Sequence, residues 1–168
     1  MKKIILFVLA VTLTASAWSS VLIGKVDIQK VLVTVKEGQK VRDKLKKSFE
    51  SKQSILKKEE EGIKSLQETY KKQSLVMNDQ AKTKKEREIQ GKIMALQQKS
   101  MGFQKEIQQM EEKLKKPILE KVRVIIEEVS KSTGVEMTFE ASTAPIVYAK
   151  SEKDLTDNVI ELYNKRHK

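Results

Sequence analysis

The 168-residue sequence contains no cysteine, one histidine, two prolines and six glycines. Without cysteine the chain can form no disulfide framework, thiolate zinc site, iron–sulfur cluster or cysteine nucleophile. The single histidine, His167, lies next to the C-terminal residue, and the sequence has no glycine-rich phosphate loop and no carboxylate–histidine spacing typical of metal ligation. We therefore expect that the protein is not an enzyme and holds no cofactor or metal.

Charged residues are abundant by contrast. The chain carries 34 Lys and Arg against 23 Asp and Glu, a formal net charge of +11. A basic excess of this size would suit a nucleic-acid-binding protein. However, the basic residues alternate with glutamates along the chain, and only 5% of the residues are aromatic. This pattern favours long solvated helices, and we expect no specific nucleic-acid binding.

Residues 1–17 have the pattern of a secretory signal peptide. Lys2 and Lys3 precede an apolar run over 4–13, and Ala15-Ser16-Ala17 supplies a small-residue cleavage pattern. The apolar run is shorter than the ~20 residues that a membrane-spanning helix needs. We expect cleavage after Ala17 and export to the bacterial periplasm, a compartment without ATP. An uncleaved membrane anchor is the alternative.

The segment 36–132 predicts two long helices. One apolar or aromatic residue recurs every seven positions, at Phe49, Leu56, Ile63, Tyr70 and Met77, although three of the five companion positions are polar. A second heptad pattern is cleaner and comprises Ile89, Ile93, Leu96, Ser100, Phe103, Ile107, Met110 and Leu114. The phase breaks near Asn78-Asp79, which we expect to form the turn and the start of the second helix. Helices over 36–77 and 80–132 would then form an antiparallel hairpin, with one unbroken helix as the alternative.

The two ends of the chain predict short strands and a last helix. Alternating apolar residues predict strands over 22–28 and 135–140, and an apolar run predicts a buried strand over 146–149. Gly134 is the expected C-terminal cap of the second long helix, and Asp154 the expected cap of the last helix. The predicted fold class is mainly α with a small β body, an α+β protein in which a long helical hairpin projects from an oligomeric core.

We expect the β body, residues 18–35 and 133–168, to be shared between copies of the chain. So few strand residues bury little core of their own, and a small sheet leaves edges that need a partner. The apolar residues that we expect at this oligomerisation site are Leu22, Val26, Ile28, Val135, Met137, Phe139 and Val147.

Two groups on the hairpin, the arm 36–132, are candidate binding residues. The first comprises Phe49, Leu56, Ile63, Tyr70 and Phe103, which can either pack helix against helix or face a bound chain. The second is a basic cluster at the hairpin tip, formed by Lys71, Lys72, Lys82, Lys84, Lys85 and Arg87. This cluster either contacts anionic lipid headgroups or acidic segments of a partner, or is a loop kept soluble by its charge.

Both ends of the mature chain carry motifs of a known family. The motifs are residues 23–32 (IGKVDIQKVL), 117–122 (PILEKV), Gly134-Val135, 147–149 (VYA) and 154–160 (DLTDNVI). In their order and spacing, and with the signal peptide, they resemble the Skp/OmpH family of periplasmic chaperones. The middle of the chain matches only in its helical, basic character.

The resemblance implies a homotrimer with a β-barrel-like core, from which three helical hairpins surround a cavity. It implies that unfolded outer-membrane proteins are held there without ATP, which would make the chain a holdase chaperone. A structural coiled-coil or tethering protein of the envelope is the main alternative, and a basic nucleic-acid-binding protein is the more distant one.

Overall fold

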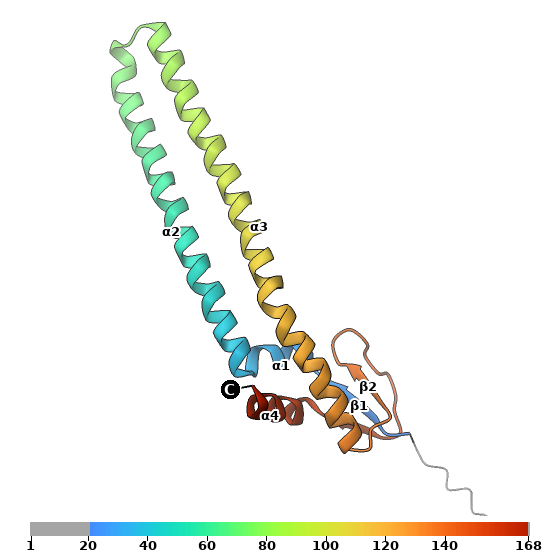
Figure 1. Ribbon diagram of the computed structural model, residues 1–168. Coiled ribbons are helices and arrows are strands. Elements are labelled where there is room, and N and C mark those ends of the chain that lie inside the picture. The colour runs from blue at the N-terminus through green and yellow to red at the C-terminus, as the bar shows by residue number, and fades with distance from the viewer. Residues whose placement is uncertain (1–20, 168) are drawn as a thin grey trace, which may run out of the picture.

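The computed structural model describes residues 21–167, so the predicted signal peptide lies outside the described residues. An arm of two long helices projects from a small body (Figure 1), which confirms the predicted fold class. The elements in chain order are β1 (Ile23–Val26), α1 (Ile28–Thr34), α2 (Lys36–Gln73), the 3-10 turn η1 (Ser74–Val76), α3 (Asp79–Ser132), β2 (Met137–Glu140), β3 (Glu152–Asp154) and α4 (Thr156–Arg166).

Helices α2 and α3 form the predicted antiparallel hairpin. They contain 38 and 54 residues, so at ~1.5 Å per residue they extend about 57 and 81 Å. The predicted turn is confirmed, because the Asn78 side chain accepts a hydrogen bond from the Ala81 N–H at 2.9 Å and caps α3. Helix α2 ends at Gln73 because the next three residues tighten into η1. Helix α3 continues unbroken through Pro117 and ends before Gly134, whose φ of 70° confirms the predicted cap.

The sheet has three parallel strands in the order β2-β1-β3. The predicted strand over 146–149 is wrong. The chain is irregular there, Val147 is fully exposed, and the third strand is β3, which contains only charged residues. Backbone hydrogen bonds flank β3 on both sides. The Ile23 N–H donates to the Ser151 carbonyl at 3.2 Å, and the Leu155 N–H donates to the Lys25 carbonyl at 2.9 Å. An exposed edge strand needs no apolar side chains, so periodicity could not reveal it.

The body has a core within one chain, which corrects the premise that it buries little core of its own. Helices α1, α3 and α4 pack with the sheet around one buried cluster. Its members are Val26, Val31, Leu32, Val35, Val41, Ile118, Val122, Ile125, Val129, Val135, Leu155, Val159 and Tyr163. The premise was wrong because it counted strand residues only, whereas nine of the thirteen members lie in helices.

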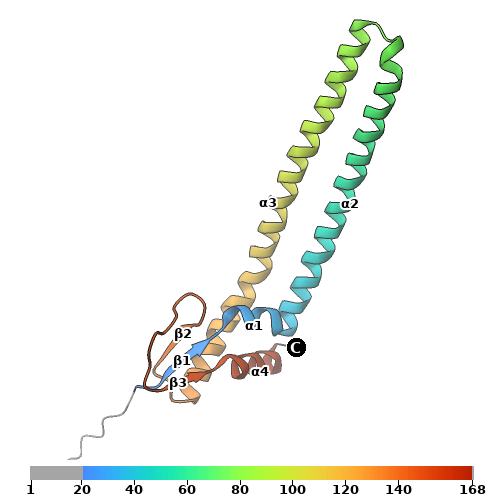
Figure 2. The same ribbon diagram turned by 180° about the vertical axis from the view of Figure 1, so that it is seen from behind.

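Helix α4 holds the base of the arm (Figure 2). No side chain of the residue before α2 caps that helix, but the Asn164 side chain accepts a hydrogen bond from the Lys36 N–H at 2.9 Å. The Glu37 carboxylate accepts bonds from Lys121 Nζ on α3 at 2.8 Å and from the Tyr163 hydroxyl at 2.6 Å. Gly38 allows the start of α2 to lie close to the end of α1, because a Cβ at this position would lie 1.7 Å from the Leu32 carbonyl oxygen. The start of α2 is therefore fixed to both α3 and α4.

Candidate functional surface of the helical hairpin

The predicted seam residues of the arm differ in their surroundings. Ile63 is buried between the helices, whereas Leu56, Tyr70 and Phe103 are half-buried. Phe49 is 56% exposed although it lies on the same heptad row. The row thus serves helix packing at Ile63 and leaves an accessible aromatic ring nearer the body.

Polar side chains bridge the two helices where the seam is not apolar. Lys52 pairs with Glu106, and Glu59 pairs with Lys99. In each helix a lysine precedes a glutamate by seven residues, and because the helices run antiparallel, each lysine faces a glutamate of the other helix. A slip of the helices by one heptad would therefore bring Lys52 opposite Lys99 or Glu59 opposite Glu106, and like charges repel. The ion pairs thus favour one register of the hairpin.

Two further contacts involve the aromatic residues of the seam. The ammonium of Lys52 lies 4.2 Å from the centre of the Phe103 ring, a cation–π contact. The Tyr70 hydroxyl donates a hydrogen bond to Glu86 at 2.5 Å, and this bond raises the pKa of Tyr70 above its usual value. Both rings are therefore engaged in interhelical contacts and are less free to bind a partner than Phe49.

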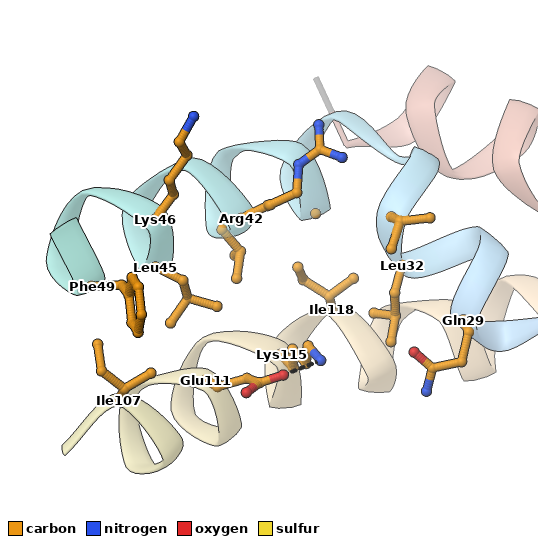
Figure 3. Close-up of a pocket in the computed structure, with 13 residues that line it drawn as sticks. Gln29, Leu32, Arg42, Leu45, Lys46, Phe49, Ile107, Glu111, Lys115 and Ile118 are labelled. Atoms are coloured by element: carbon orange, nitrogen blue, oxygen red, sulfur yellow. Dashed lines mark hydrogen bonds and ion pairs between the residues drawn. The ribbon is translucent and has the colours of Figure 1, made fainter. Parts of the chain in front are cut away.

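Two adjacent hollows open between α2 and α3, with volumes of about 370 and 400 Å³. We call them together the arm groove. The hollow beside the body is drawn in Figure 3, where Leu45, Phe49 and Ile107 face one another across the gap. The hollow farther along the arm is lined by Phe49, Lys52, Gln53, Leu56, Ser100, Phe103, Gln104, Ile107, Gln108 and Glu111. Because Phe49 and Ile107 line both hollows, the two hollows adjoin at these side chains.

The rim of the arm groove is mainly cationic. Arg42 and Lys46 of α2 line it and extend toward solvent (Figure 3). Glu111 also lines it but already pairs with Lys115. The nearest carboxylate to Lys46 is Glu50, whose oxygen is 3.9 Å from the ammonium. The groove therefore combines an apolar interior with an excess of positive charge.

The predicted basic cluster flanks an apolar pair along the chain at the arm tip. Leu75 and Val76 of η1 are 89% and 88% exposed. The basic side chains are exposed except for Lys82 and Lys85, which are half-buried, and Lys85 pairs with Glu88 at 2.7 Å. Sequence reasoning missed the apolar pair, although its signal was present as two apolar residues out of phase with the heptads.

The seven predicted oligomerisation residues also separate into groups. Val26 and Val135 are buried in the core of the single chain, and Leu22 and Ile28 pack partly against it. Phe139 is half-buried beside the loop 141–151, while Met137 and Val147 are exposed. The residues that remain accessible to a second copy therefore lie on β2 and on this loop.

Within residues 21–167 no cluster of His, Cys, Asp and Glu could hold a metal ion. Over the same residues, no helix combines the length and apolarity required to cross a membrane. The only histidine, His167, lies against Tyr163 with the ring centres 4.8 Å apart and the ring planes tilted by 56°.

The architecture is that of a long helical hairpin on a small α+β body, and it is similar to a known structure. This is the crystal structure of a candidate outer membrane chaperone (OmpH-like) from Caulobacter crescentus. The two superimpose with a TM-score of 0.71 at 18% sequence identity, over 89% of this chain and 86% of the other.

At the level of sequence, residues 22–163 match the family described as outer membrane protein (OmpH-like). The chain therefore belongs to the OmpH-like family, which confirms the resemblance found in the end motifs. None of the curated proteins gives a match to this sequence.

Proposed function

We propose that the protein is an ATP-independent holdase chaperone of the periplasm, which encloses unfolded outer-membrane proteins and prevents their aggregation. The observation that carries the proposal is the uncovered apolar groove on a projecting cationic arm. Unfolded chains expose apolar segments, and such segments are removed from water when they enter a groove of this kind. Family membership and the chaperone description of the Caulobacter protein agree with this role. No catalysis and no specific nucleic-acid binding are part of the proposal.

The holding mechanism combines attraction with many weak contacts. The positive field of the arms would draw in chains that carry acidic residues, and this steering is screened over about 8–10 Å at physiological ionic strength. Single apolar contacts would remain weak, but several arms acting on one chain would raise the effective affinity. Release would follow when the outer-membrane protein folds into the membrane and buries those segments elsewhere.

The proposal includes a homotrimer joined through the body. Strands β2 and β3 are the two edges of the sheet, and unpaired strand edges bind further strands. Beside them the loop 141–151 exposes Val147 completely and Tyr148 to 82%. Sedimentation equilibrium of the mature protein tests this step, and a single species of one-chain mass would refute it.

The chaperone proposal is tested by light scattering. An outer-membrane β-barrel protein unfolded in urea is diluted into buffer with mature protein and without nucleotide. We expect aggregation to be suppressed at a modest molar excess of the protein. Unchanged aggregation would refute the holdase function and favour a tethering protein of the envelope, which would bind one fixed partner.

The arm tip supports a second proposed contact, with anionic lipid headgroups. Two exposed apolar side chains, Leu75 and Val76, stand among basic residues, and this combination is typical of segments that bind at a lipid–water interface. We expect sedimentation with vesicles that contain phosphatidylglycerol but not with phosphatidylcholine alone. Leu75→Asp should weaken this binding, whereas Met101→Asp, at an exposed apolar position in the middle of α3, should not. Equal binding to both kinds of vesicle would refute the contact.

A further inference from the structure

We propose that the arm groove is a binding subsite for a short polypeptide segment in which large apolar side chains stand next to a carboxylate. The inference rests on the proposed holdase function and makes it more specific. It assigns recognition to one part of the arm, between α1 and the Lys52–Glu106 pair, and gives it a chemical preference.

The apolar interior of the groove lacks a covering element among the described residues. Leu45, Phe49 and Ile107 point into the gap from both helices, yet the Phe49 side chain remains 56% exposed (Figure 3). Heptad residues usually interlock with the facing helix. Here the helices leave a hollow in place of that packing, and an entering apolar side chain would bury the ring.

The size and spacing of the hollows fit side chains of an extended chain. Volumes of about 370 and 400 Å³ lie within the range of ligand pockets, roughly 300–1,000 Å³. Leu45 and Lys52, which line one hollow each, are seven residues apart on α2, about 10 Å along the helix axis. A chain in the extended polyproline II conformation rises about 3.1 Å per residue and returns to the same face every third residue, so it covers that distance in about three residues. A segment with two large apolar residues about three positions apart would fill both hollows.

The charge of the rim gives the groove its preference. No carboxylate among residues 21–167 forms an ion pair with Arg42, and Lys46 has only the distant Glu50. A carboxylate on the incoming segment would supply the missing partner, whereas a lysine there would be repelled. A flat lipid surface cannot enter a hollow between two helices, so the geometry favours a polypeptide over a membrane.

The test uses the full mature protein and two fluorescein-labelled peptides. Both carry two leucines three residues apart, followed by aspartate in one peptide and by lysine in the other. Fluorescence anisotropy should give tighter binding of the aspartate peptide. Phe49→Ala should weaken it about five- to tenfold, while Ile55→Ala, at a 41% exposed position of the same helix outside the groove, should leave it within twofold. Arg42→Glu should reverse the preference between the peptides, and the matched variant Lys44→Glu, exposed on α2 outside the groove, should retain it.

A second measurement does not depend on these variants. A photo-crosslinking residue in place of Val33, at the lip of the groove, should capture an unfolded β-barrel protein, and one in place of the equally exposed Val124 should not. The inference would be overturned if each variant and its control had equal effects, or if the two crosslinking positions captured the client equally. It would also be overturned if Phe49→Ala changed the oligomeric mass, or if stoichiometric decanoate displaced the peptide. If these tests overturn the groove but the wild-type protein still suppresses aggregation in light scattering, only the groove proposal is refuted. If the wild-type protein does not suppress aggregation, the holdase proposal is refuted independently of the groove.

Discussion

The joint between arm and body predicts a measurable coupling between Glu37 and Tyr163. Tyr163 is fully buried, and its hydroxyl donates to the Glu37 carboxylate at 2.6 Å. Glu37→Ala would leave that hydroxyl without an acceptor and would remove two bonds from Lys121. A buried unsatisfied donor costs about 1–3 kcal/mol. Because Glu37 and Lys121 are about one-third exposed, their ion pair adds less than 1 kcal/mol. We expect Glu37→Ala to lower the free energy of unfolding by about 2–3 kcal/mol.

The assay is urea unfolding followed by far-UV circular dichroism at one fixed protein concentration. Tyr163→Phe keeps the buried ring and removes only the donor, so it should cost about 1 kcal/mol. The double variant should cost about 1 kcal/mol less than the sum of the single variants, because neither partner is then left unpaired. Glu60→Ala, at an exposed position of the same helix, is the control. The coupling between Glu37 and Tyr163 would be refuted if the free-energy costs of the two single variants were simply additive in the double variant. It would also be refuted if Glu37→Ala and Glu60→Ala had equal effects.

Three further predictions follow from other parts of the chain. Lys52→Glu should destabilise the arm by about 1 kcal/mol, and adding Glu106→Lys should restore its thermal unfolding midpoint, since the pair sets the register. Hydrogen bonds from Ser142 and Thr143 lower the pKa of Glu140 from 4.5 to about 2, so its contribution to stability is present above pH 4.5 and is lost as the pH falls toward 2. Glu140→Gln should remove this part of the pH dependence in thermal melts. Val147→Asp should dissociate the oligomer in sedimentation without unfolding the chain, because the side chain is fully exposed within one copy; an unchanged mass would remove this loop from the interface.

The hairpin could be predicted from the sequence because its signals are local. A heptad period reports which face of a helix is apolar, and Asn78 caps α3 through its own side chain. The body was predicted less well, because its core depends on contacts between distant segments. Val26 is buried by α1, α3 and α4 rather than by a second copy, and the exposed strand β3 carries no apolar pattern.

The arm groove could not be predicted at all. Phe49 and Ile63 occupy equivalent heptad positions, yet one is mostly exposed and the other buried. Periodicity reports which face of the helix the two residues share, but not how much of each side chain the neighbouring residues cover. The exposed pair Leu75-Val76 was detectable in principle, since it interrupts a run of polar residues at the turn.

The holdase account is tested most directly by shortening the arm. Deleting residues 44–113 and joining the helices by a short turn would retain the buried core of the body, whose members all lie outside the deleted segment. We expect the shortened protein to keep the cooperative unfolding and oligomeric mass of the body but to lose its ability to hold a urea-unfolded outer-membrane protein in solution, because Phe49, Leu56 and Ile107 of the arm groove are removed with the arm. A shortened protein that still prevents aggregation as well as the full-length arm would contradict the account.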